Sequence, residues 1–160
     1  MPKKTPPTDL KLNDFLCFAV YAAGHGFNRV YKPLLEPLGL TYPQYLVMTA
    51  LWEQDDQTVG GLGERLSLES NTLTPLLKRL ENQRRIRRVR DPRDERQVRV
   101  RLTAAGRALG GEAAHIPHCI LEASGLSAGD LSRLQRQITV LHKALESVAD
   151  SRNLIGKAKS

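Results

Sequence analysis

The sequence has few of the residues that build metal sites and structural disulfides. It contains two cysteines and four histidines in 160 residues, and no CxxC or HExxH spacing occurs among them. A bound metal therefore has little support, and we expect no cofactor. Cys17 and Cys119 are about a hundred residues apart in a chain without a secretory signal, so we expect no structural disulfide either.

Long hydrophobic runs are also missing. No apolar stretch approaches the roughly 18 to 20 residues that a membrane-spanning helix needs, and the opening MPKKTPPTDL is charged and contains prolines. We therefore expect a cytoplasmic protein that does not enter a membrane, with a flexible segment over residues 1–11. The length and the 41% hydrophobic content favour one globular domain over residues 12–150, followed by a tail over 151–160.

Positive charge is present in excess, and it is concentrated in one segment. The whole chain has 24 Lys and Arg against 17 Asp and Glu, a net charge of +7. Between Lys78 and Arg101 there are eleven basic and four acidic residues, which accounts for the whole excess. Such a stripe is typical of a surface that contacts nucleic-acid phosphates. The alternative is a solvated charged face, which normally mixes the two signs more evenly.

Two short amphipathic segments lead into this stripe. Residues 59–67 have the length of a two-turn helix, residues 68–70 form a tight turn, and residues 71–83 predict a second helix that Ser70 or Asn71 begins. Leucines occupy one face of the second helix, with polar and basic residues elsewhere. These proportions are those of a helix-turn-helix, whose second helix enters the DNA major groove.

A β-hairpin is predicted directly after the second helix. Apolar residues alternate with arginines on both sides of a turn that is rich in proline and aspartate, DPRDER. This hairpin would be the wing of a winged helix-turn-helix. Its tip carries Arg93 and Arg96, which are well placed to enter a narrow minor groove.

Helices are also predicted N-terminal to this region. Apolar residues recur at helical spacing across 13–31, with Asn13 or Asp14 as the N-cap. Residues 32–40 contain two prolines and predict only a brief helical turn. A further helix follows, capped by Thr41 and with a proline in its first turn.

The C-terminal part is predicted to form two helices, one over 103–124 with a break around Pro117 and one capped by Ser127. The last helix carries an apolar stripe that needs a partner surface. A second copy of the chain would bury it and place two recognition helices one DNA turn apart, roughly 34 Å. Packing within the chain is the alternative. The stripe consists of Leu131, Leu134, Ile138, Leu141 and Leu145.

Together these elements predict a mostly α-helical fold with a small β-hairpin, in which a winged helix-turn-helix over about 45–103 is flanked by dimerisation helices over about 12–38 and 104–150. With the phrases LTYPQYLVMTALWE, LTPLLKRLE and DPRDERQVRVRLTAAG, this order resembles the MarR family of transcription regulators, and within it the branch of organic hydroperoxide resistance regulators (OhrR). The resemblance covers most of the chain. It implies a homodimeric repressor that binds double-stranded, pseudo-palindromic operator DNA, with an organic hydroperoxide as inducer.

The resemblance also implies a set of sensing residues. Cys17 stands where this branch has its peroxide-sensing cysteine, and Tyr31 and Tyr42 correspond to tyrosines that hydrogen-bond the sensor sulfur from the partner subunit. Tyr21 matches a third tyrosine near the site. Cys119 resembles the resolving cysteine of a two-cysteine subset, in which it forms an intersubunit disulfide with the sensor.

For DNA, the resemblance implies contacts from both the recognition helix and the wing. Two departures from the family pattern occur, Asn71 where relatives usually have glycine, and Arg84 with Arg85 where they commonly have Gly-Leu. An arginine at a left-handed helix cap costs about 1 kcal/mol relative to glycine, which puts the orientation of the wing in doubt. The implied contact residues are Ser70, Asn71, Thr72, Thr74, Lys78, Arg79, Arg88, Arg93, Asp94 and Arg96.

The chemistry of Cys17 fits a sensor on its own terms. Peroxides react with thiolates rather than thiols, and Cys17 lies about one turn from the expected helix start, where free backbone N–H groups favour an anion. Phe15, Phe18, Val20 and Phe27 would give it apolar surroundings that favour organic hydroperoxides over hydrogen peroxide. The alternative for a lone helical cysteine is a small buried hydrophobic residue.

Three other functions stay open from the sequence. A ligand-gated MarR-type repressor would release DNA on binding a phenolic or lipophilic small molecule, and its Cys17→Ser variant would still respond. A thiol peroxidase would use Cys17 catalytically, but local spacing fixes no histidine or basic residue beside it, so we expect no enzyme. An architectural DNA protein would not prefer an operator over random DNA.

Overall fold

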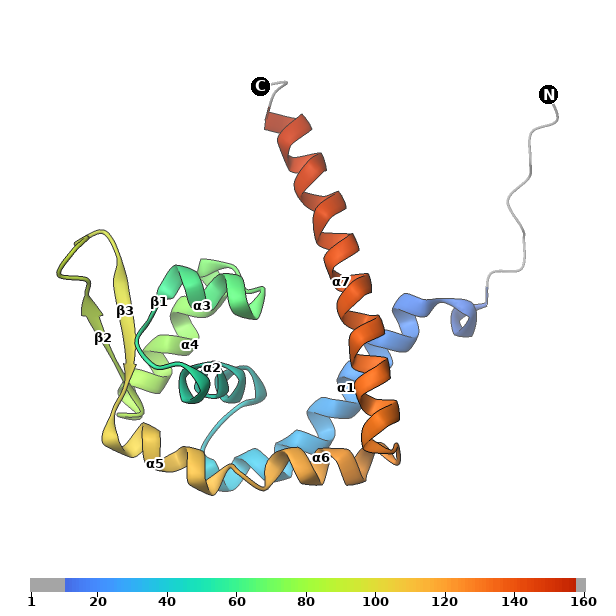
Figure 1. Ribbon diagram of the computed structural model, residues 1–160, viewed down its shortest axis with the longest axis horizontal. Coiled ribbons are helices and arrows are strands. Elements are labelled where there is room, and N and C mark those ends of the chain that lie inside the picture. Colours follow the sequence, from blue (N-terminus) through green and yellow to red (C-terminus); the bar gives the residue numbers. More distant parts are fainter. Residues whose placement is uncertain (1–10, 158–160) are drawn as a thin grey trace. The chain divides into compact units, whose positions relative to one another are not determined.

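The structure is a computed structural model that describes residues 11–157, with side-chain surroundings over residues 11–150 (Figure 1). Contacts within the chain divide it into two compact units, one ending at Ile116 and the other beginning at Pro117. Most of the segment predicted to be flexible at the N-terminus, and the end of the predicted tail, lie outside the described residues. The fold is mostly α-helical with a small antiparallel sheet, as the sequence predicts.

The helices and strands follow one another in the order of a winged helix-turn-helix flanked by further helices (Figure 1). The first unit contains α1 (Leu16–Leu35), α2 (Tyr42–Glu53), β1 (Gln57–Thr58), α3 (Val59–Leu66), α4 (Ser70–Asn82), β2 (Ile86–Arg90), β3 (Val98–Leu102) and α5 (Ala104–Glu112), with 3-10 helices at Leu12–Asp14 and Glu36–Leu38. Helix α6 (Ile116–Ser124) begins at the last residue of this unit, and α7 (Ala128–Lys157) follows in the second unit.

Helix α1 differs from the prediction at both ends. Phe15, rather than Asn13 or Asp14, is its N-cap, because Leu12–Asp14 already forms a 3-10 helix, and no side chain caps the helix start. The helix also continues through Pro33, where only a brief turn was predicted. Its last turn places Leu35 in the core, where the residue is 1% exposed. We attribute the continuation to this burial, which offsets the hydrogen bond that proline cannot donate.

Helix α2 begins with the predicted cap and forms the centre of the first unit. The Thr41 hydroxyl accepts the Gln44 amide, and the Gln44 side chain accepts the Thr41 amide at 2.8 Å, so that the two residues form a capping box. Val47, Met48 and Leu51 of this helix are fully buried. They pack with core leucines of α3 and α4 and thereby fix the helix-turn-helix to α2.

The sheet has three strands, of which the sequence predicts two. Strands β2 and β3 form the predicted hairpin, in register from Ile86 opposite Leu102 to Arg90 opposite Val98. The two-residue strand β1 pairs antiparallel with β3 on its other side, and the sequence pattern predicts no strand there. Two residues are too few to show strand periodicity, so only the pairing partner identifies β1.

The connection from α4 to the wing contains Arg84, which stands where relatives commonly have a glycine at a left-handed helix cap. Arg84 has a φ of 58°, and its carbonyl oxygen accepts a 2.7 Å hydrogen bond from the Thr103 hydroxyl. The Arg85 amide donates back to the carbonyl of Leu80 at 3.0 Å. The helix end therefore keeps the geometry that glycine usually provides.

The second unit consists of most of α6 and of α7. The Ser127 hydroxyl accepts the Asp130 amide at 3.1 Å, which confirms the predicted cap at the start of α7. Along the apolar stripe of α7, Leu134, Ile138 and Leu145 are exposed. Packing within the described residues therefore leaves most of this stripe uncovered.

Candidate DNA interface and thiol site

Helix α4 separates its apolar and polar residues onto opposite faces. Leu73, Leu77 and Leu80 are at most 1% exposed and anchor the helix in the core. All of the helix residues expected to contact DNA lie on its exposed surface. They are Ser70, Asn71, Thr72, Thr74, Lys78 and Arg79.

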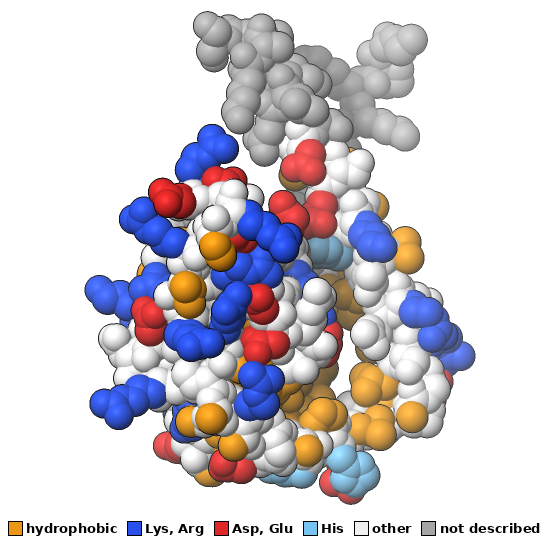
Figure 2. All heavy atoms as spheres, turned by 60° about the vertical axis from the view of Figure 1, so that its left-hand side comes forward, with side chains coloured by type: hydrophobic (Ala, Val, Ile, Leu, Met, Phe, Trp, Pro, Cys, Tyr) orange, Lys and Arg blue, Asp and Glu red, His pale blue; other side chains and the backbone are white. Residues whose placement is uncertain are grey.

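A hollow of about 760 Å³ separates α4 from the wing. Ser70 and Thr74 line it on the α4 side, Arg96 and Val98 on the wing side, and the start of α3 closes one end. Figure 2, which brings the wing forward, shows many Lys and Arg side chains on this face with acidic side chains among them. Of the residues expected to contact DNA, the structure thus brings Ser70, Thr74, Arg88 and Arg96 to the lining of one hollow.

The wing residues expected to contact DNA differ in how firmly they are held. The Arg96 side chain is 92% exposed and lies 3.2 Å from Asp94. Arg93 is exposed, while its backbone amide donates to Asp91 at 2.8 Å. Arg88, in contrast, donates two side-chain hydrogen bonds to Glu81 of α4, at 3.0 and 2.8 Å. These bonds lower the pKa of the Glu81 carboxyl.

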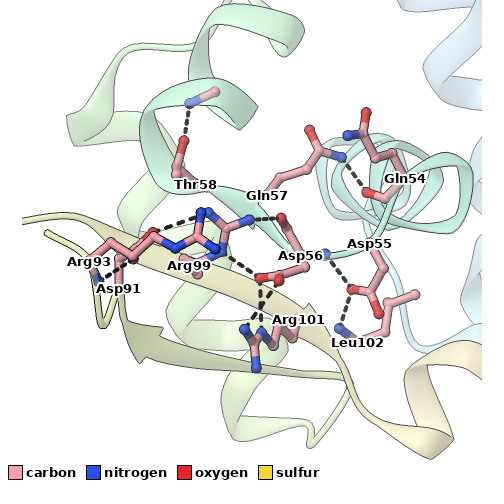
Figure 3. A network of polar contacts seen from close by, with 11 residues as sticks. Gln54, Asp55, Asp56, Gln57, Thr58, Asp91, Arg93, Arg99, Arg101 and Leu102 are labelled. Atoms are coloured by element: carbon pink, nitrogen blue, oxygen red, sulfur yellow. Dashed lines mark hydrogen bonds and ion pairs between the residues drawn. The ribbon is translucent and has the colours of Figure 1, made fainter.

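Several arginines of the basic stripe are neutralised within the protein. Arg99 and Arg101 of β3 both contact the carboxylate of Asp56, which precedes β1 (Figure 3). The sequence pattern assigns Asp56 no role in sensing or in DNA contact. The sequence shows only that Arg99 and Arg101 are two apart on a strand and so face the same side. It does not show which acidic residue they meet.

Cys17 is the second residue of α1, closer to the helix start than predicted, and it is exposed. Of the apolar residues expected around it, Phe15, Val20 and Phe27 are exposed as well, at about 40% each, whereas Phe18 is half-buried. Tyr21 is also exposed, and its ring lies 4.4 Å from that of His25. The first unit therefore offers the thiol and its apolar neighbours on an open surface.

Tyr31 and Tyr42 lie together, away from the start of α1 in sequence. Their ring centroids are 4.5 Å apart, and the buried Tyr45 lies 5.7 Å from Tyr31. Burial, followed by the two neighbouring phenols, raises the pKa of Tyr31 to about 12, and burial raises the pKa of Tyr42 as well. Both hydroxyls therefore stay protonated near neutral pH and are available as hydrogen-bond donors.

Cys119 is half-buried in α6 and belongs to the second unit, whereas Cys17 belongs to the first.

Over the described part of the chain there is no group of three His, Cys, Asp or Glu side chains that could hold a metal ion. Nor does any helix between residues 11 and 157 have the length and apolar character needed to cross a membrane.

The chain is similar to known families and proteins that regulate transcription. A family described as transcriptional regulator SarA/Rot matches residues 29–111. The chain is 46% identical to the HTH-type transcriptional regulator TtmR of Methylorubrum extorquens, over 89% of this chain and 73% of that protein. It is 45% identical to the organic hydroperoxide resistance transcriptional regulator of Bacillus subtilis, over 85% of this chain and 92% of that protein.

Solved structures of AbfR from Staphylococcus epidermidis are similar in both sequence and fold. Reduced AbfR bound to DNA matches with a TM-score of 0.71 and 35% identity, over 84% of this chain and 93% of AbfR. AbfR has also been solved in an overoxidised form bound to DNA and in a disulfide form, the latter with a TM-score of 0.59 and 36% identity over 81% of this chain and 91% of AbfR.

Proposed function

The chain belongs to the SarA/Rot and MarR-type winged-helix transcriptional regulators, and on this premise we propose that it is a homodimeric repressor whose operator binding is controlled by oxidation of Cys17. The observation that carries the proposal is the exposed thiol of Cys17 in the first turn of α1, in a chain 45% identical to an organic hydroperoxide resistance regulator. The start of α1 places this thiol where a peroxide can reach it from solvent.

DNA recognition uses the two surfaces that border the hollow beside α4. The exposed hydroxyl and amide groups at the start of α4 reach base edges and phosphates in the major groove. Arg93 and Arg96 at the wing tip reach the minor groove. The reduced, DNA-bound form of AbfR supports this assignment, because that protein shares the fold of this chain.

Sensing begins when the Cys17 thiolate attacks the terminal oxygen of an organic hydroperoxide. The O–O bond breaks, the sulfur becomes a sulfenic acid, and the alkoxide leaves and takes a proton from solvent to give the corresponding alcohol. The Cys119 thiol of a partner subunit then attacks the sulfenic sulfur, releasing water and forming an intersubunit disulfide. Each thiol reacts once per event, so the protein acts as a sensor and not as a turnover enzyme.

The disulfide links sensing to DNA release through geometry. It forms only when the two Cα atoms come within about 7 Å, so any larger separation in the reduced dimer forces helices to move. That movement changes the distance between the two recognition helices and weakens operator binding. The disulfide form of AbfR supports this route, because a similar chain has been solved in that state.

Dimerisation covers the apolar surfaces that each unit leaves exposed. On α1 these include Leu16, Val20 and Phe27, and on α7 they include Ile138 and Leu145. Isolated apolar side chains on a surface are ordinary, but a repeating series along a helix indicates a protein interface. A second copy of the chain fits, since two identical subunits match a two-fold symmetric operator.

The experiment is operator release measured by fluorescence anisotropy with and without cumene hydroperoxide. Wild type should release DNA, Cys17→Ser should stay bound, and Cys119→Ser should release poorly and accumulate overoxidised Cys17. Release by Cys17→Ser at the wild-type concentration of peroxide would contradict the proposal. Exposed Ser147→Cys serves as the matched control for an additional reactive thiol and should respond as wild type does.

A second candidate function is favoured by a cavity of about 510 Å³ beside the C-terminal half of α1. Apolar surface from Leu35 and Leu40 lines it, and its wall carries polar groups from Lys32, Glu36 and Tyr42. Such a site suits a phenolic or lipophilic acid, which would make the chain a ligand-gated repressor. In that case Cys17→Ser releases the operator when the small molecule is added, whereas Lys32→Ala does not.

A further inference from the structure

Asp56 is held in an unusual backbone conformation between α2 and β1. Its φ is 60°, a left-handed value that a residue other than glycine adopts at a cost. Its Oδ1 atom accepts hydrogen bonds from Arg99 Nε at 2.7 Å and from Arg101 Nε at 2.9 Å. Arg101 also donates to Oδ2 at 3.1 Å, and Arg99 donates to the backbone carbonyl of Asp56. One acidic residue therefore binds two neighbouring guanidinium groups.

The contacts continue from Asp56 to the tip of the wing. Arg99 donates from its third nitrogen, Nη1, to Asp91 Oδ2 at 3.1 Å, and Asp91 Oδ1 accepts the backbone amide of Arg93 at 2.8 Å (Figure 3). Asp91 is only 8% exposed, and its own amide donates to the carbonyl of Gln97 on the other side of the hairpin turn. The Asp56 carboxylate is thereby joined to the backbone of Arg93 through two intervening side chains.

The Asp56 carboxylate also offsets the positive charge of Arg99 and Arg101. The Arg99 and Arg101 side chains are 27% and 37% exposed, so both remain within reach of solvent and of a polyanion. The two arginine hydrogen bonds lower the pKa of Asp56 to about 2, and the carboxylate is therefore ionised at every pH at which the protein binds DNA. Two arginines that would otherwise attract phosphates of any sequence are occupied by the protein itself.

We propose that Asp56 is a positioning residue for DNA specificity, which holds the wing tip in place through Arg99 and Asp91 and withholds Arg99 and Arg101 from non-specific phosphate contacts. The inference rests on the proposed use of the wing in operator binding. The residue touches no base itself. It determines whether Arg99 and Arg101 are available to phosphates, and it fixes the position of Arg93.

Asp56→Asn tests this inference with little disturbance of the backbone. Asparagine has the same shape and tolerates the left-handed conformation, so the variant removes the charge alone. The measured quantity is the ratio of affinities for the duplex that wild type selects from a random library and for a scrambled duplex. We expect this ratio to fall about tenfold, because operator binding weakens while non-specific binding is kept or strengthened. On scrambled DNA the slope of log affinity against log salt should steepen by an amount that corresponds to up to about two additional phosphate contacts.

Asp55→Asn is the matched control on the same turn. The Asp55 carboxylate accepts the amides of Leu102 and Asp56, both at 2.8 Å, and pairs with Arg107 at 3.1 Å. It therefore anchors the backbone of the turn, whereas the hydrogen bonds to Arg99 and Arg101 come from Asp56. Its affinity ratio should stay within about twofold of wild type. Asp91→Asn, which breaks the second link of the connection, should lower the ratio as Asp56→Asn does. An equal loss in Asp55→Asn would reduce the role of Asp56 to general support of the turn and overturn the inference.

Circular dichroism first establishes that each variant is folded. If Asp56→Asn does not fold, Arg99→Gln is measured in its place, since it breaks both links and leaves the pair between Asp56 and Arg101. A folded variant with the wild-type ratio overturns the inference while leaving the proposed function intact. A wild type without any operator preference contradicts the proposed function instead, and the two failures are thus distinguished.

Discussion

The indole nitrogen of Trp52 donates a 2.8 Å hydrogen bond to the backbone carbonyl of Gly106, which joins the end of α2 to the start of α5. The contact is close because α5 presents glycines to its neighbours. A Cβ atom on Gly110 would lie 3.2 Å from the Trp52 ring, and one on Gly106 would lie 1.9 Å from the carbonyl oxygen of Arg85. Helix α5 is therefore fixed against both α2 and the residue that precedes the wing.

Gly106→Ala should destabilise the first unit, because the Arg85 carbonyl belongs to the backbone and cannot move aside as a side chain would. We expect a loss of about 2 to 3 kcal/mol in the free energy of unfolding, measured by urea denaturation. Gly111→Ala is the control in the same helix, where an added Cβ meets nothing within 4 Å. It should be neutral or stabilise by up to about 1 kcal/mol. Equal stabilities of the two variants would show that the close approach is absent.

Trp52→Phe should test the hydrogen bond separately from the packing. Phenylalanine keeps an aromatic ring near Tyr45, whose centroid lies 6.1 Å from that of Trp52, but it has no donor for Gly106. We expect a loss of about 1 to 2 kcal/mol in unfolding free energy, combining the lost bond with the smaller ring. A variant as stable as wild type would contradict a role for the indole N–H.

Arg84→Gly should stabilise the protein. Glycine adopts a φ of 58° without strain, whereas arginine pays for it, and the relief exceeds the extra freedom that glycine gains in the unfolded chain. We expect a gain of about 0.5 to 1 kcal/mol in the free energy of unfolding. Arg85→Gly, at the next position with ordinary backbone geometry, should destabilise instead. A loss of stability in Arg84→Gly would indicate that the arginine side chain contributes more than its strained backbone costs.

Arg96 and Arg88 should separate DNA contact from structural support. The Arg96 side chain is 92% exposed and pairs with Asp94 of the same turn at 3.2 Å, an exposed contact that a DNA phosphate can replace. Arg96→Ala should therefore weaken operator binding and reduce the salt slope by about one without changing stability. Arg88 is paired with Glu81, so Arg88→Ala should lower stability by about 1 kcal/mol or less. Anisotropy titrations at several salt concentrations and thermal melts of both variants give the comparison. Unchanged operator binding in Arg96→Ala would contradict the assigned role of the wing tip.

Tyr31 should make stability depend on pH in the alkaline range. Its pKa is raised from 10.0 to about 12 by burial and by its tyrosine neighbours, so the folded protein holds this proton more tightly than the unfolded chain does. The resulting stabilisation is present in full below about pH 10 and is lost as the pH rises towards 12. Tyr31→Phe should therefore show a shallower decline of unfolding free energy over this interval than wild type. Parallel curves would contradict the buried environment of the phenol.

The sequence predicts best those elements whose causes are local. The cap at Thr41 needs only Gln44 three residues later, and the hairpin needs only its own alternation and turn, so both are confirmed. The left-handed conformation of Arg84 was expected from the family resemblance, because relatives commonly have Gly-Leu at this point, and it is observed. The prediction that the helix ends before Pro33 was wrong. The local preference of proline opposes a helix there, whereas burial of Leu35 in the core supports it.

The candidate site was harder to predict where its contacts are long-range. Asp56 meets arginines 43 and 45 residues further along the chain, and nothing in its immediate neighbours indicates that pairing. The basic stripe was visible as a count of charges, but a count does not distinguish the exposed Arg96 from Arg99, which is neutralised internally. Spacing assigns residues to elements, and only the tertiary fold decides which charges remain free for DNA.

The account as a whole depends on one chemical event, the oxidation of the Cys17 sulfur. The most direct measurement follows operator release by anisotropy during titration with cumene hydroperoxide, while mass spectrometry reads the oxidation state of Cys17 in the same samples. The account predicts that the released fraction rises in step with the fraction of Cys17 present as the intersubunit disulfide. Release while Cys17 remains a thiol, or full occupancy of the operator with Cys17 present as a disulfide, would contradict it.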